Sequence, residues 1–246
     1  MFPIADDNPR IETPMVTWTF IAVCVLVFFW QLSLGPNGGE IAVYQFGMIP
    51  ARLFGSASLD PDLVAVPAWA TVLTSMFMHG GWMHLGFNML FLWIFGDNVE
   101  DSMGHGRYLV FYLLCGIAAA MAQAFVNPGS TVPMVGASGA ISGVLGAYLL
   151  LHPHATVRTV IFLGIFVTMM HLPALVVLGL WILLQLVSAA FSSSGEPGVA
   201  FWAHIGGFVA GMALVPLFKK RDVSLFQPAR HRAFQVERRH GPWGSG

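Results

Sequence analysis

Four polar side chains stand out because each lies within or at the start of a long apolar stretch: His84, Asn88, Ser138 and His204. A polar side chain inside a membrane is costly, so it is a functional suspect by default. A serine hydroxyl is a weak nucleophile until a neighbouring base takes its proton, and an imidazole that titrates near neutral pH can be that base. The residue types therefore predict nucleophilic catalysis, with Ser138 as the nucleophile and His204 as the general base.

The residues around Ser138 fit this chemistry. The sequence Gly-Ala-Ser-Gly-Ala at 136–140 leaves the hydroxyl uncovered. If a helix begins there, its free N–H groups and the positive end of its dipole lie beside the hydroxyl. His84 and Asn88 are four residues apart and share one helix face. We expect these two side chains and the Ser138 N–H to stabilise an oxyanion.

The elements that must position these residues are membrane helices. The chain of 246 residues is 56% hydrophobic and only 9% charged, whereas soluble domains are about 25% charged. We therefore expect an all-α, polytopic membrane protein with six transmembrane helices. The net charge of −1 gives no basic field, so no nucleic-acid partner is expected. The six apolar stretches are 15–34, 82–95 (extending to 99), 108–126, 133–151, 174–191 and 199–218.

A seventh apolar stretch, 159–170, is too short to cross a bilayer, and we expect an interfacial or re-entrant segment there. His84, Ser138 and His204 then each lie near the outer end of a span, and these three spans run in the same direction. The side chains are therefore predicted to meet at one depth. Small residues support close packing of the fourth and sixth spans, because they recur every four positions at 139, 143 and 147 and at 207 and 211.

The basic residues predict the orientation. Of the 11 Lys and Arg residues, only Arg52 falls outside, while Arg10, Arg107, Arg158 and the seven between 219 and 239 fall inside. This predicts a short cytoplasmic N-terminus at 1–14 and a six-span unit at 15–218. The unit has a long outer loop at about 35–81 that lies on or partly in the membrane. A basic cytoplasmic tail at 219–246 is expected to be disordered and to face anionic lipid.

Three pieces, in this order along the chain, resemble the signatures of the rhomboid family of intramembrane serine proteases. They are His-Leu-Gly-Phe-Asn at 84–88, Gly-Ala-Ser-Gly at 136–139 and Ala-His-Ile-Gly-Gly-Phe-Val-Ala-Gly at 203–211. The resemblance covers about 18–218 and implies a six-helix rhomboid-like bundle with a water-filled cavity open to the outer face. It implies Ser138 as nucleophile, His204 as base, and His84 and Asn88 as oxyanion-stabilising residues.

The resemblance also implies the substrates, which are membrane-anchored proteins cut in or near a transmembrane helix. It implies no metal and no cofactor. The first span has no signal-peptide pattern ahead of it and no transit peptide is evident, so we expect a bacterial cytoplasmic (inner) membrane. The active site would open to the outer, periplasmic side.

The chain departs from the family pattern in two places. Ser142 stands where some relatives carry an aromatic residue that stacks on the histidine, so another group must orient His204. Trp69 is followed by Ala70, where the family often has a Trp-Arg pair. No carboxylate is expected near the site, so the sequence predicts a Ser-His dyad rather than a triad.

Two glutamines and one loop have weaker signals. Gln123 and Gln185 are expected to form hydrogen bonds between helices. The polar loop 192–198 is either a lid over the site or a plain connector.

Two rival functions stay open at this point. One is an inactive relative that binds transmembrane segments without cutting them. The other is a transporter or channel with a path lined by serine and histidine, which the absence of an internal repeat and of an embedded carboxylate relay disfavours.

Overall fold

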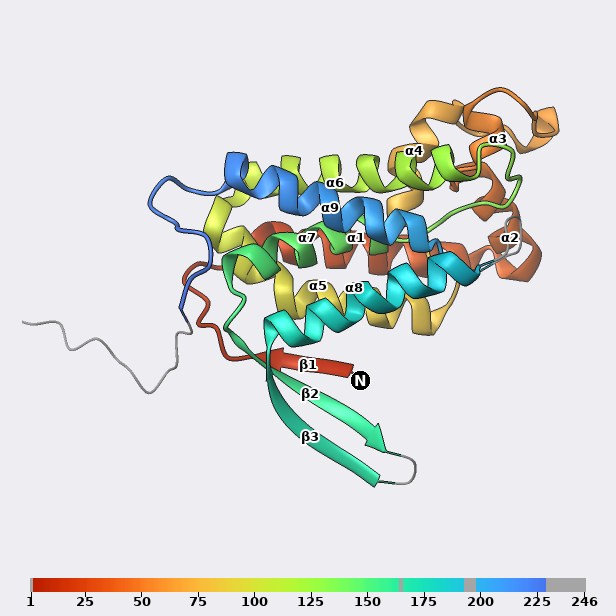
Figure 1. The fold of residues 1–246 in the computed structure, drawn as a ribbon. Coiled ribbons are helices and arrows are strands. Elements are labelled where there is room, and N and C mark those ends of the chain that lie inside the picture. The colour runs from red at the N-terminus through yellow and green to blue at the C-terminus, as the bar shows by residue number, and fades with distance from the viewer. Residues whose placement is uncertain (1, 164–165, 193–197, 229–246) are drawn as a thin grey trace, which may run out of the picture.

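The computed structural model describes residues 2–163, 166–192 and 198–228, and the fold is mostly helical (Figure 1). Within these residues, six long helices form a bundle: α1 (Met15–Ser33), α5 (Trp82–Met103), α6 (His105–Val126), α7 (Ser138–Leu151), α8 (Ala174–Phe191) and α9 (Phe201–Phe218). They follow the six predicted stretches, except that the fourth becomes helical only at Ser138. In Figure 1, α5, α7 and α9 begin at one end of the bundle, here called the outer end. The opposite end is called the inner end.

The bundle is that of an integral, multi-pass membrane protein. Four helices in the described part of the chain, α1, α6, α8 and α9, are long and apolar enough to cross a membrane. A fifth crossing is formed if Pro61–Phe77 and α5 count as one span, which is bent by 77°. α7 is apolar but has only 14 residues. The predicted number of six spans therefore stays a prediction.

The centre of the bundle is α7, which packs against α5, α6 and α9. The small residues predicted to allow a close approach of α7 and α9 do so. A Cβ atom added to Gly207 would overlap the carbonyl oxygen of Gly139, and one added to Gly211 would overlap that of Gly143. These backbones touch because neither helix has a side chain between them.

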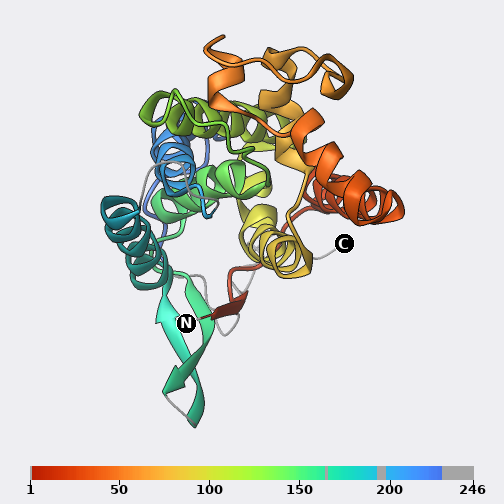
Figure 2. The same cartoon turned by 90° about the vertical axis from the view of Figure 1, so that its right-hand side faces the viewer.

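The predicted outer loop, 35–81, is built from short helices rather than irregular chain. These are α2 (Gly35–Phe46), α3 (Pro50–Leu53), η1 (Pro61–Leu63), η2 (Ala68–Ala70), α4 (Thr71–Thr74) and η3 (Ser75–Phe77). Figure 2 views the bundle from its outer end and shows them gathered on one side of it. Backbone contacts join this region to the segment before α7. Met48 and Met134 form a β-bridge, and the Gly136 N–H donates to the Ser75 carbonyl at 2.8 Å.

The prediction of an all-α fold is wrong, because a β-sheet lies beside α5 and α8. The segment expected to be interfacial or re-entrant lies in a β-hairpin of β2 (Thr156–Leu163) and β3 (Phe166–Pro173). β1 (Phe2–Asp6), within the predicted N-terminal segment 1–14, pairs antiparallel with β2, which gives a sheet in the order β1-β2-β3. The sheet projects from the bundle beside α5 and α8 (Figures 1 and 2). β2 is rich in Val, Ile and Thr, which favour strands, and the length of the apolar run alone does not reveal this preference.

The basic tail is described as far as residue 228, and 229–246 lie outside the described residues. The N–H groups of Phe226 and Gln227 donate to the carbonyls of Leu150 and Leu151 at 2.7 and 2.9 Å. These bonds satisfy carbonyls that the last turn of α7 leaves without a partner in the helix. The start of the tail is therefore fixed to the inner end of the bundle.

Candidate active site

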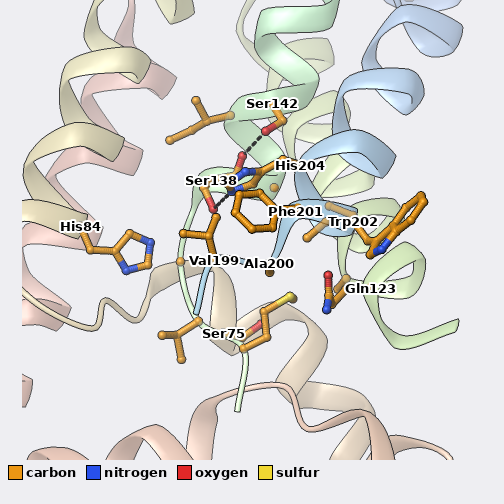
Figure 3. A pocket seen from close by; sticks show the side chains of 18 of the residues that line it. Ser75, His84, Gln123, Ser138, Ser142, Val199, Ala200, Phe201, Trp202 and His204 are labelled. Atoms are coloured by element: carbon orange, nitrogen blue, oxygen red, sulfur yellow. Dashed lines mark hydrogen bonds between the residues drawn. The ribbon is translucent and has the colours of Figure 1, made fainter. Parts of the chain in front are cut away.

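The structure brings Ser138 and His204 into contact at the outer end of the bundle. Ser138 is the first residue of α7 and His204 lies in the first turn of α9. The Ser138 Oγ atom is 2.9 Å from the His204 Nε2 atom (Figure 3). The close approach of α7 and α9 allows a short side chain and an imidazole to meet. In this geometry the hydroxyl can donate its proton to the ring, as general-base catalysis requires.

α8 holds the other side of the His204 ring. The Oε1 atom of Gln185 lies 2.8 Å from His204 Nδ1. The ring of Trp181, one turn earlier on α8, has its centroid 5.9 Å from that of His204. An amide oxygen can only accept a hydrogen bond, so Nδ1 carries the proton and Nε2 presents its lone pair to Ser138. In this arrangement Gln185 would favour the tautomer that a general base needs.

The role of Gln185 was missed in the sequence, although it does form a hydrogen bond between helices as expected. Trp181 and Gln185 are four residues apart and so lie on one face of α8. That spacing groups the two residues on one face of α8, but it does not show that this face is turned toward His204. Ser142 does not take this place, because its hydroxyl donates to the Ser138 carbonyl within α7 at 2.6 Å.

His84 lies on the opposite wall of the cavity, in the first turn of α5 (Figure 3). Its Nδ1 atom accepts the N–H of Gly80 at 3.3 Å, so in the neutral ring the proton is on Nε2. Gly136, at φ 126°, separates this nitrogen from the serine. A Cβ atom there would lie 2.7 Å from His84 Nε2 and 3.7 Å from Ser138 Oγ. Glycine is required by both the conformation and the space.

Asn88 lies one turn after His84 and also lines the cavity. Its side chain is buried, and its Nδ2 atom donates to the His84 carbonyl at 2.8 Å. An amide nitrogen carries two hydrogens, so this bond leaves one of them for a group in the cavity. The four predicted site residues thus all border one space.

That space is a cavity of about 1000 Å³, with walls from α5, α6, α7 and α9 and from the segment before α7. Gln123 points into it (Figure 3). Among the described residues the Gln123 Oε1 atom has no hydrogen-bond partner, contrary to the interhelical role expected of it. The predicted lid, 192–198, lies outside the described residues over 193–197. The described residues contain no group of three or more His, Cys, Asp or Glu side chains that could hold a metal ion.

Comparison with known proteins identifies the family. Residues 67–221 match the Rhomboid domain. The rhomboid protease GluP of Bacillus subtilis (strain 168) is 38% identical over 136 residues, which are 55% of this chain and 24% of that protein. Rhomboid-like protein 11, chloroplastic, of Arabidopsis thaliana is 30% identical over 164 residues, 63% of this chain and 54% of its own length. The rhomboid protease GlpG of Klebsiella pneumoniae subsp. pneumoniae is 26% identical over 200 residues, 80% of this chain and 61% of that protein.

The match to the family runs through all four site residues, from the start of α5 to the end of α9. The chain spans less than two thirds of the length of each of these three relatives. Helical bundle, residue pattern and sequence match agree, and the chain belongs to the rhomboid family.

Proposed function

We propose that the protein is an intramembrane serine endopeptidase that cuts transmembrane or membrane-proximal segments of membrane-anchored proteins. The observation that carries the proposal is the chain of contacts from Ser138 through His204 to Gln185, at 2.9 and 2.8 Å, on the wall of a large cavity. Two of the relatives, GluP and GlpG, are named as rhomboid proteases. A protein that only binds transmembrane segments would not need a base in hydrogen-bond contact with the serine.

In the first half of the reaction, Ser138 Oγ attacks the carbonyl carbon of the scissile peptide bond while its proton passes to His204 Nε2. The carbonyl oxygen becomes an oxyanion. The His84 Nε2–H, the second hydrogen of the Asn88 amide and the Ser138 N–H at the start of α7 are the donors that would stabilise it. His204 then gives its proton to the leaving amine, the C–N bond breaks, and an acyl ester remains on Ser138.

In the second half, a water molecule in the cavity attacks the ester, and its proton passes to His204 Nε2. The C–O bond to Ser138 breaks and the hydroxyl regains its proton. Gln185 accepts the Nδ1–H bond throughout and supports the imidazolium that forms in each half. The dyad is thus completed by an uncharged amide rather than by a carboxylate.

The position of the site in the bundle limits the substrate. A peptide bond inside a helix is shielded by backbone hydrogen bonds, so a transmembrane substrate must unwind locally before Ser138 can reach it. The proposal includes six spans and a cytoplasmic inner end, because basic residues gather there in Arg10, Arg107, Lys219 and Lys220. The cavity would then open to the outer, periplasmic side of a bacterial inner membrane.

The test is cleavage of single-span substrates that carry small residues near the outer membrane boundary. Wild type, Ser138→Ala and His204→Ala would be compared in liposomes by gel and mass spectrometry. Matched controls are Ser33→Ala and His154→Ala, because both residues are exposed and neither lines the cavity. We expect cleavage by wild type and both controls, and loss in the two site variants.

Two outcomes would overturn the proposal. Cleavage that survives in Ser138→Ala would exclude Ser138 as the nucleophile. Substrate that co-purifies with every form, with no cleavage by any, would assign the protein to the non-catalytic binders.

A further inference from the structure

A second cavity, of about 430 Å³, lies at the inner end of the bundle. Its walls come from the first turn of α1, the inner half of α5 and the N-terminal segment 4–10. One wall carries Asp6, which Tyr148 contacts from the last turns of α7. Since α7 begins at Ser138, this cavity and the active site lie at opposite ends of the same helix.

The charges in this cavity form no close ion pair with one another, although Arg10 attracts the Asp97 carboxylate from a longer distance. Asp6 Oδ2 accepts from the Tyr148 hydroxyl at 2.5 Å and from Asn98 Nδ2 at 3.1 Å. Asp97 Oδ1 accepts from the backbone and side-chain nitrogens of Asn98 at 2.7 and 2.9 Å. All of these donors are neutral. Among the described residues no ion pair within 4 Å joins Arg10 to either carboxylate.

Arg10 instead lies over the ring of Trp18, 5.7 Å from its centroid. Two carboxylates and one guanidinium therefore line the same space, and each can still take a charged partner. Burial raises the pKa of Asp6 to about 7, with Asp97 and Asp7 adding to the rise. A cation bound between the carboxylates would relieve this unfavourable burial.

The mouth of the cavity is apolar and aromatic. Trp18 and Trp93 are 40% and 57% exposed, and their rings stack with centroids 6.4 Å apart. Exposed tryptophans are typical of the headgroup level of a membrane protein. Ala22 and Leu26, four and eight residues after Trp18, continue this exposed stripe along α1. The acyl chain of a lipid could follow the stripe from the mouth of the cavity toward the middle of the bilayer.

We propose that this cavity binds a phospholipid whose headgroup carries both a phosphate and an ammonium group, as in phosphatidylethanolamine. The phosphate pairs with Arg10, the ammonium lies between Asp6 and Asp97, and an acyl chain follows the Trp18 stripe. A lipid with only negative charge would meet two carboxylates. A simple cation would leave Arg10 unpaired. The proposal is independent of the protease activity.

The test is native mass spectrometry of the full chain, released from detergent, with phosphatidylethanolamine or phosphatidylglycerol of identical acyl chains. Wild type is expected to bind phosphatidylethanolamine about tenfold more tightly, which is the difference that one additional charged contact supplies. Asp97→Asn should abolish this preference. Arg10→Gln should weaken the binding of both lipids. Asp62→Asn and Arg158→Gln are matched controls on exposed residues outside the cavity and should bind as wild type does.

A third arm separates a lipid from a soluble ligand with the same headgroup chemistry. Phosphoethanolamine added at the same concentration should not displace the lipid, because it lacks the chains that contact α1. Displacement would show a site for a soluble ligand and overturn the proposal. Equal binding of the two lipids by wild type would also overturn it. Thermal unfolding of each variant shows whether it is folded. Arg10 is exposed, so Arg10→Gln should fold, and its effect on lipid binding tests the proposal even if Asp97→Asn is unstable.

Discussion

α5 carries polar residues at both ends, and the two ends differ in what their hydrogen-bonding groups contact. At the inner end, Glu100 is 1% exposed, and its carboxylate accepts bonds from the N–H groups of Val16 and Thr17, from the Thr17 hydroxyl and from His105. These contacts cap the start of α1. At the outer end, His84 and Asn88 border the large cavity, and each keeps a donor that no residue of its own helix uses.

Under the proposed function, this difference separates a structural polar group in a membrane helix from one that takes part in the reaction. Both kinds are expensive to bury, so burial does not separate them. Both oxygens of the Glu100 carboxylate accept hydrogen bonds from backbone and side-chain donors. These bonds hold the start of α1 in place and leave no group for a ligand. The outer pair lines an open space with its hydrogen-bonding capacity incomplete. A buried polar residue therefore indicates a functional site when it keeps an unused hydrogen-bond donor or acceptor and borders a cavity.

The largest effect on stability is expected from Glu100→Ala. The change leaves two backbone N–H groups and the Thr17 hydroxyl without their acceptor. We expect the free energy of unfolding, measured in mixed micelles, to fall by at least about 3 kcal/mol. The control is Glu12→Ala, whose side chain is 46% exposed and pairs with Lys220 at 3.1 Å. That change should cost less than about 1 kcal/mol. Equal losses in the two variants would remove the distinction between the buried and the exposed carboxylate.

The opposite pattern is expected of His84→Ala. Loss of its Nε2–H removes an oxyanion donor, so the cleavage rate constant should fall roughly 10²–10³-fold. The free energy of unfolding should change little, because among the described residues the His84 ring accepts a hydrogen bond from Gly80 alone, and that bond is long. His154→Ala, at an exposed inner position, serves as the control in both assays. A stable variant with wild-type cleavage would show that the outer end of α5 is not part of the machinery.

A smaller effect is expected at Gln185, which acts through His204. Gln185→Leu removes the acceptor of the Nδ1–H bond, and we expect kcat to fall roughly tenfold to a hundredfold with little change in KM. Gln185→Glu supplies another acceptor at the same length and should restore most of the lost rate. Failure of Gln185→Glu to exceed Gln185→Leu would mean that α8 contributes packing alone.

The smallest effect is a pH dependence of stability from Asp6. Burial, together with Asp97 and Asp7, raises the pKa of Asp6 from 3.8 to about 7, against the lowering effect of the Tyr148 bond. Between these two pKa values the folded protein holds a proton on Asp6 that the unfolded chain releases. The contribution of Asp6 to the free energy of unfolding is therefore complete below about pH 4 and is lost as the pH rises through about 7. The thermal midpoint should fall by a few degrees between pH 5 and pH 8. Asp6→Asn should flatten that fall, and an unchanged slope would contradict it.

The parts of the structure that could be predicted are those with local signals. The starts of α5, α7 and α9 were predicted to bring His84, Ser138 and His204 to one depth, because helix direction follows from counting spans. The small residues at 139, 143, 207 and 211 predicted the contact of α7 and α9, since side-chain size alone limits how closely two helices pack.

The parts that could not be predicted depend on distant partners. β2 forms with β1, which is about 150 residues earlier, and a short apolar run does not show whether it is a strand. The bond from Gln185 to His204 depends on how α8 is rotated about its axis beside α9. No periodicity within α8 fixes that rotation relative to a neighbouring helix.

If Ser138 is a nucleophile activated by His204, a reagent that forms a covalent bond with activated serines should label it. Purified wild type, His204→Ala and Gln185→Glu would be treated with a fluorophosphonate, and the modified residue would be located by peptide mass spectrometry. We expect a single adduct on Ser138 in wild type and Gln185→Glu, and almost none in His204→Ala. An adduct on a different serine of the cavity, such as Ser75 or Ser142, or equal labelling of Ser138 without His204, would contradict it.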